Sequence, residues 1–81
     1  MYKTTEIKDV DGTSFVTTTS HEEPYFYYET GNYFIHDDGT VSEFELYRRA
    51  EDKEQALINH RKLVGIIRDT IDSYYERRWD K

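Results

Sequence analysis

The sequence predicts an α+β fold, in which an antiparallel meander of four to five strands carries one long C-terminal helix packed on one face. Apolar residues in the last third of the chain recur at helical spacing, whereas short aromatic and β-branched runs alternate with turn residues before it. A chain of 81 residues has room for one pair of packed layers. We therefore expect a single domain over 1–81, with a sheet portion at 1–48 and a helix at 51–79.

The helix is predicted by a wide apolar stripe. Steps of about 100° per residue bring the following residues to one side: Ala56, Leu57, His60, Leu63, Val64, Ile67, Ile71, Tyr74, Tyr75 and Arg78. Asp52 is followed three residues later by Gln55, a variant of the capping box, so we start the helix near Asp52. We expect His60, within the stripe, to lie at the edge of the core and to be hydrogen-bonded to the sheet or to a Tyr.

Two apolar residues of the helix, Ile58 and Ile66, point away from this stripe, toward the side that holds Gly65. They fit a strongly curved sheet or simple exposure, because single exposed apolar residues are normal. They also fit an oligomer interface made by Ile58, Gly65 and Ile66, because a glycine lets a second backbone approach closely. A coiled-coil seam is a weaker alternative, since the pattern covers barely three heptads.

The first two strands are expected at residues 3–10 and 13–19. Asp11-Gly12 between them supplies the positive φ angles of a tight turn. The first strand alternates poorly and should lie at the sheet edge, where Lys3 and Lys8 would prevent further strand pairing. A turn around Pro24 follows, because proline disfavours helical geometry at the residue before it.

The aromatic runs 25–28 and 33–36 should form the two central strands, joined by a turn at 29–32. Aromatic rings then lie on both faces of the sheet, and the helix covers only one face. Some rings should therefore remain accessible. They could stack on bases or pack across strands, but a protein interface, where Tyr is an enriched anchor, agrees better with the surrounding charge.

A second Asp-Gly turn at residues 37–40 leads into a strand at 41–47. In that strand we expect Phe44 and Leu46 to be buried. An alternative begins a helix at Ser42, with Ser42 and Glu45 as its capping box.

Charge is spread unevenly along the chain. Residues 1–47 contain two Lys against ten acidic residues, a net −8, whereas residues 48–81 contain nine Lys and Arg against seven acidic residues, a net +2. An acidic sheet repels nucleic acid and attracts basic protein surfaces. We therefore expect a basic protein partner, possible self-association as a homodimer, and no direct nucleic-acid contact. The candidate partner-binding residues are Glu22, Glu23, Tyr25, Tyr27, Glu29, Asp37, Asp38, Glu43 and Glu45.

No catalytic, metal or cofactor site is predicted. The three histidines fall on a loop, a strand and the helix stripe, the chain contains no Cys, and no Gly-rich phosphate loop is present. We therefore expect a protein that is not an enzyme. The absence of Cys, of an apolar run of about 20 residues and of a signal-peptide core at the start favours a cytoplasmic protein without a membrane span.

One resemblance covers about a third of the chain. The run Asn32-Tyr33-Phe34-Ile35 through Asp37-Asp38-Gly39-Thr40-Val41, with the helix start Lys53-Glu54-Gln55-Ala56, resembles a pattern in small accessory proteins of phages and prophages. The resemblance implies a class that includes anti-CRISPR proteins, several of them acidic DNA mimics that act in the host cytoplasm. It implies an inhibitor that blocks a basic, nucleic-acid-handling host protein such as a CRISPR effector. The alternative is a structural or regulatory homo-oligomer that associates through the helix.

Overall fold

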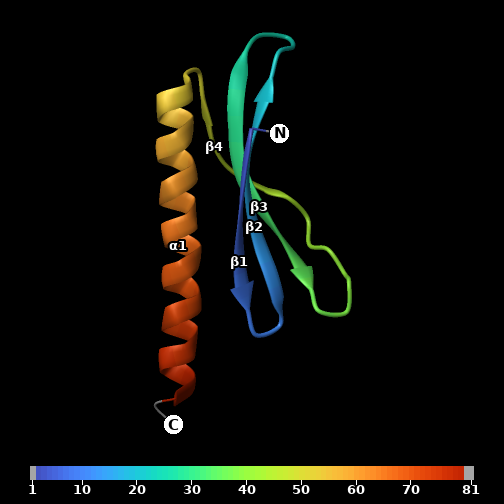
Figure 1. The fold of residues 1–81 in the computed structure, drawn as a ribbon, viewed down its shortest axis with the longest axis vertical. Coiled ribbons are helices and arrows are strands. Elements are labelled where there is room, and N and C mark those ends of the chain that lie inside the picture. Colours follow the sequence, from blue (N-terminus) through green and yellow to red (C-terminus); the bar gives the residue numbers. More distant parts are fainter. Residues whose placement is uncertain (1, 80–81) are drawn as a thin grey trace.

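The computed structural model describes residues 2–79, and the side chains of residues 2–72. Four strands, β1 (Lys3–Asp9), β2 (Gly12–His21), β3 (Tyr27–His36) and β4 (Glu45–Ala50), precede one helix, α1 (Lys53–Trp79). The strands form one antiparallel sheet in the order β1-β2-β3-β4. Helix α1 lies along one face of the sheet, and its last turns extend beyond the end of the sheet (Figure 1). The predicted α+β fold is therefore confirmed, with four strands.

Helix α1 begins where the capping pattern places it. The Asp52 carboxylate accepts a hydrogen bond from the backbone N–H of Gln55 at 2.7 Å, which satisfies one of the free amides of the first turn. The Gln55 side chain donates to Asn59 instead of returning to the cap, so half of the capping box forms. Within the described residues, no helix has both the length and the apolar character that a membrane crossing needs.

The core between the helix and the sheet is small. Ile7, Val16 and Leu63 form its centre, and partly buried side chains pack against them, namely Tyr47, Val64, Ile67 and Ile71. A second cluster near the start of α1 joins Tyr28, Ala50 and Ala56. The predicted stripe therefore supplies the helix side of the core as far as Ile71. Its last members, Tyr74, Tyr75 and Arg78, lie outside the described side chains.

A series of buried hydrogen bonds, which we call the His60 chain, also connects the helix to the sheet. His60 is 1% exposed, and its two ring nitrogens hydrogen-bond the hydroxyls of Thr5 and Thr18, each at 2.8 Å. The Thr18 hydroxyl also hydrogen-bonds that of Thr30, at 2.8 Å, so the His60 chain spans β1, β2 and β3. Burial lowers the pKa of His60, and the positive charge of Lys3 lowers it further. The prediction that this histidine is hydrogen-bonded to the sheet is confirmed.

The first hairpin differs from its prediction by one residue. Asp9 pairs with Gly12, so the two turn residues are Val10 and Asp11, and Gly12 opens β2. Among the described residues, none other than glycine has a positive φ, so the positive φ expected at Asp11 is wrong. The prediction of an edge strand is confirmed, because β1 is the outermost strand and exposes Lys3 and Lys8.

The predicted turn at 29–32 is wrong, because β3 runs through it without interruption. Every residue from Tyr27 to His36 pairs with β2. Thr30 is 1% exposed and joins the His60 chain, so burial and hydrogen bonding keep this polar residue extended. The connection between β2 and β3 instead occupies residues 22–26, so Tyr25 and Phe26 lie in a loop, not in a strand.

Strand β4 begins at Glu45, not at Val41, which makes only an isolated bridge to Ile35. The expected burial of Phe44 and Leu46 is also wrong, because they are 46% and 48% exposed. Thr30 pairs with Arg48 and Gly31 pairs with Leu46, so Tyr47 is an extra residue in a bulge. Tyr47 packs on the core in place of Phe44 and Leu46.

The stability of the wild-type protein should depend on the protonation of His60. Its pKa is lowered in the folded state, so the unfolded chain binds more protons below about pH 6.5. The stabilisation is complete above that pH and is lost as the pH falls toward the pKa of the folded state. We expect the free energy of unfolding, measured by urea titration between pH 7 and pH 5, to fall less steeply in His60→Gln. The limit for one proton is about 1.4 kcal/mol per pH unit.

The matched control for this prediction is His36→Gln, which removes an exposed imidazole and should keep the wild-type pH dependence. Equal slopes in wild type and His60→Gln would contradict the prediction.

Gly31 and Gly65 should respond oppositely to alanine. A Cβ at Gly31 would collide with the Phe44 ring and with the backbone oxygen of Glu45, whereas among described atoms none lies within 4 Å of a Cβ at Gly65. We expect Gly31→Ala to lower the free energy of unfolding by about 1–3 kcal/mol. Gly65→Ala, in an exposed part of the helix, should raise it by about 0.5–1 kcal/mol. Denaturant unfolding compares the two, and an unchanged stability of Gly31→Ala would refute the close approach.

Candidate functional site

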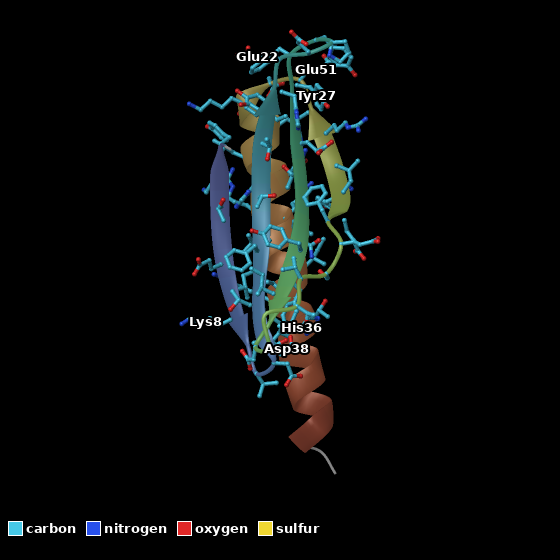
Figure 2. All side chains as sticks on the ribbon, turned by 90° about the vertical axis from the view of Figure 1, so that its right-hand side faces the viewer. Lys8, Glu22, Tyr27, His36, Asp38 and Glu51 are labelled. Carbon is cyan, nitrogen blue, oxygen red and sulfur yellow. The ribbon has the colours of Figure 1, made fainter. Side chains whose placement is uncertain are left out.

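The face of the sheet opposite α1 has no helix over it among the described residues (Figure 2). Alternation along the strands places Phe15, Tyr33, Ile35 and Leu46 on this open face, because their strand neighbours face the helix. The segment that leads into β4 adds Val41 and Phe44 to this face. Val41 is 60% exposed and pairs with Ile35 in an isolated β-bridge. We call these residues the apolar band: Phe15, Tyr33, Ile35, Val41, Phe44 and Leu46.

The apolar band is held by specific packing. The rings of Phe15 and Tyr33 stack with centroids 5.1 Å apart and planes 10° from parallel. The ring of Phe44 lies where Gly31 has no side chain, and Thr17, which pairs with Gly31, is only 4% exposed. A face that is ordered and partly apolar before any partner arrives loses little entropy on binding.

One end of the open face carries a cluster centred on Tyr27. The His21 ring stacks on Tyr27 at 4.8 Å, and the Arg49 guanidinium lies 5.4 Å from the ring centroid. The Glu29 carboxylate accepts a hydrogen bond from Arg49 Nε at 3.3 Å and lies 3.7 Å from His21 Nε2. Glu29 and Arg49 sit opposite each other in the β3–β4 pairing, which brings these residues together.

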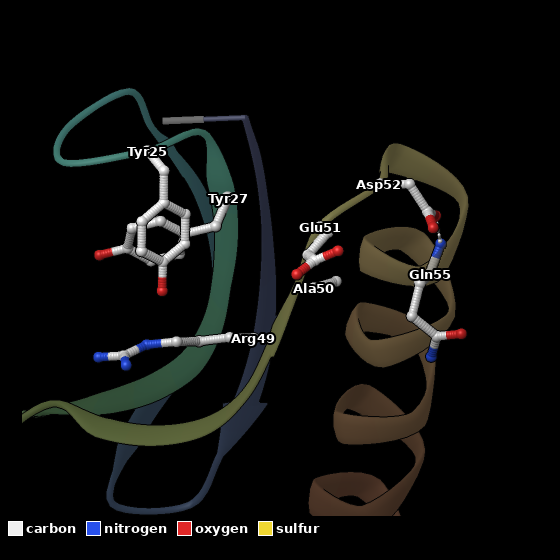
Figure 3. Close-up of a pocket in the computed structure, with 7 residues that line it drawn as sticks. All are labelled: Tyr25, Tyr27, Arg49, Ala50, Glu51, Asp52 and Gln55. Atoms are coloured by element: carbon white, nitrogen blue, oxygen red, sulfur yellow. Dashed lines mark hydrogen bonds between the residues drawn. The ribbon is translucent and has the colours of Figure 1, made fainter.

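A hollow of about 430 Å³ adjoins this cluster where β4 passes into α1. It is lined by two tyrosines, one arginine and residues that lead into and begin the helix: Tyr25, Tyr27, Arg49, Ala50, Glu51, Asp52 and Gln55. Figure 3 shows the two tyrosine rings together above Arg49, with Glu51 between them and the start of the helix. Tyr25 is 60% exposed, and its ring lies 5.3 Å from that of Tyr27. The hollow therefore combines aromatic walls with carboxylates.

The structure divides the predicted partner-binding residues into three groups. Glu22, Glu23 and Tyr25 lie in the β2–β3 connection, next to Tyr27 and Glu29 at the start of β3. Asp37 and Asp38 lie in the β3–β4 connection, at the opposite end of the sheet (Figure 2). Glu43 and Glu45 lie at the entry to β4. The acidic residues therefore lie in separate groups at the two ends of the sheet and at the entry to β4, instead of forming one continuous patch.

Two of these carboxylates are engaged within the protein. Glu29 is paired with Arg49, as described above. Asp38 accepts hydrogen bonds from the hydroxyl and the backbone N–H of Thr40, and these bonds lower its pKa. Asp38 thus stabilises the turn, in which Gly39 has a φ of 90°.

The predicted oligomer residues lie on the outer side of α1. Ile66 is 49% exposed and Gly65 is exposed, whereas Ile58 is partly buried. The exposed apolar surface of this side is therefore concentrated near Ile66.

Sequence reasoning missed the contributions of Arg49, Glu51 and Asp52. Arg49 lies close to Glu51 and Asp52 in sequence, but it pairs with Glu29, twenty residues away. The strand register brings this pair together, and the bulge at Thr30/Gly31 shifts that register, so no local pattern in the sequence predicts the pair. Phe44 and Leu46 were missed as surface residues for the same reason.

Within the described residues, no group of three or more His, Asp or Glu side chains is placed to hold a metal ion. None of the protein families, curated proteins or solved structures compared with this chain matches it. The surface of the protein is therefore the basis for a functional proposal.

Proposed function

We propose that this protein is a non-enzymatic binding protein whose open sheet face docks on a basic surface of another protein. The observation that carries the proposal is the uncovered apolar band. A helix protects one face of the sheet, while Phe44 and Leu46 on the other face remain about half exposed. Contiguous exposed apolar residues of this kind mark interaction surfaces in folded proteins.

The distribution of polar groups supports a protein partner. The apolar band covers the open face from the level of Gly31 to Ile35, near the end of β3. The exposed carboxylates of Asp37 and Glu43 lie in the connection next to it, and those of Glu22 and Glu23 lie at the other end of the sheet. An apolar centre with a polar rim is the usual anatomy of a protein interface. The net −8 of residues 1–47 favours a partner of opposite charge and accelerates the encounter at low salt.

In its more specific form, the proposal is an inhibitor of a nucleic-acid-handling protein. Such a partner carries Lys and Arg side chains at the spacing of phosphates, and rim carboxylates can occupy those positions. The resemblance to phage accessory proteins, and through them to anti-CRISPR proteins, points in the same direction.

A second candidate is a homo-oligomer that associates through α1. The exposed Ile66 beside Gly65 favours it, because the missing side chain allows a close approach of a second helix. The partial burial of Ile58 limits the apolar area available on this side.

Leu46→Lys and Ile66→Lys test the proposed docking face as a matched pair. The two residues are equally exposed, 48% and 49%, and each variant adds one positive charge. The partner for this test is a basic protein that the wild type captures from host lysate, that high salt releases and that DNA displaces. It should bind Leu46→Lys at least tenfold more weakly than the wild type, a loss of about 1.4 kcal/mol of binding free energy. It should bind Ile66→Lys as it binds the wild type. Equal loss in both variants, or loss only in Ile66→Lys, would refute docking through the open face.

The same two variants test self-association by light scattering after size-exclusion chromatography. If the helix forms the oligomer, Ile66→Lys should be a monomer at concentrations where wild type and Leu46→Lys are dimers. A wild type that stays monomeric up to about 1 mM, so that its association free energy is weaker than about −4 kcal/mol, excludes the second candidate.

A further inference from the structure

The hollow beside Tyr25 lies at the end of the open face, and its chemistry selects a class of ligand group. Tyr27 is already contacted by His21 on one side and by Arg49. Tyr25 is different, because it packs against Tyr27 yet is 60% exposed. An incoming group can therefore stack on Tyr25 without displacing a side chain that packs on Tyr27.

The charges around the hollow favour a cation. Arg49 and the first turn of α1 would attract an anion if they stood alone. However, Arg49 is paired with Glu29 at 3.3 Å, and the Asp52 carboxylate already caps the amide of Gln55 at 2.7 Å. An anion would also meet Glu51, which is exposed at the hollow. The hollow therefore attracts a positively charged group and not an anion.

The groups that line the hollow distinguish between a guanidinium and an ammonium. A guanidinium is planar, stacks on aromatic faces and gives paired hydrogen bonds to a carboxylate, whereas an ammonium is a compact and strongly hydrated charge. The protein already contains this arrangement once. The Arg49 guanidinium lies over the Tyr27 ring while its Nε donates to Glu29. Tyr25 and Glu51 offer a second ring and a second carboxylate at the same hollow.

We propose that the hollow receives an arginine side chain of the partner, with its guanidinium on the ring of Tyr25 and hydrogen-bonded to the carboxylate of Glu51. The inference rests on the proposed function, since it names the anchor residue of a basic partner. It assigns the end of the open face to one arginine and the apolar band to the remaining contact.

Fluorescence anisotropy with the full chain and two labelled peptides, hexa-arginine and hexa-lysine, tests this arginine site. The wild type should bind hexa-arginine at least fivefold more tightly than hexa-lysine at physiological salt. Tyr25→Ala and Glu51→Gln should each reduce that preference to less than twofold. Tyr25→Phe keeps the aromatic ring and should retain the preference.

Glu6→Gln is the matched control, because it removes one exposed carboxylate from β1 at the far edge of the sheet. It should weaken both peptides equally and leave their ratio unchanged. Equal affinities of the wild type for the two peptides, or an unchanged preference in Tyr25→Ala, would overturn the arginine site. Far-UV circular dichroism confirms that each variant is folded before binding is measured.

The two sets of experiments separate failure of the arginine site from failure of the docking face. If the peptide preference is absent while Leu46→Lys still weakens the captured partner, the arginine site fails and the docking face stands. If Leu46→Lys has no effect while the peptide preference and its loss in Tyr25→Ala are observed, the hollow binds arginine but the open face is not the docking surface.

Discussion

A single helix can cover only one face of a four-stranded sheet, and the rest of this structure depends on that constraint. The covered face receives Ile7 and Val16, which pack on Leu63 of α1. The other face keeps Phe15, Tyr33 and Phe44 at the surface, where they pack on one another or on the strand backbone. Among the described residues, no second layer covers these side chains, so apolar surface remains available for another molecule.

The covered face is unusual in its dependence on polar contacts. The fully buried side chains include His60, Asn59, Thr18 and Thr30 besides Val16. Apolar contacts tolerate sliding, whereas the hydrogen bonds from His60 to Thr5 and Thr18 are satisfied only at one position of the helix along the sheet. A small apolar core thus supplies much of the attraction, and the polar chain fixes the register between helix and sheet. That fixed register also sets where the start of α1 lies along the sheet, and hence the place of Asp52 at the hollow.

The open face obtains its shape from backbone details. The bulge in β4 turns Tyr47 into the core and leaves Leu46 outside. Gly31 lets the Phe44 ring lie directly on the sheet. The same pairing places Arg49 across from Glu29, next to Tyr27. Cation, aromatic ring and carboxylate are thus collected at one end of the face, while the apolar residues extend from the level of Gly31 toward its other end.

The sequence alone determined the elements that rest on local rules. Helical periodicity and the Asp52 cap defined α1, the poor alternation of the first strand placed β1 at an edge, and His60 was expected to be bonded to the sheet. Charge counting identified the acidic half of the chain. The helix, its cap and the edge strand depend on neighbours in sequence, so short patterns predict them; the partners of His60, Thr5 and Thr18, lie 55 and 42 residues away and came only from the structure.

Tertiary structure alone decided the rest. Thr30 and Gly31 resemble a turn in sequence but lie within β3, because pairing with β2 and the bond to Thr18 outweigh local preference. Phe44 and Leu46 alternate as buried residues do, yet a one-residue bulge leaves them exposed. The acidic residues are close in sequence, but the ten-residue length of β3 places them at opposite ends of the sheet. Each outcome depends on strand register, a contact between distant segments that no local pattern encodes.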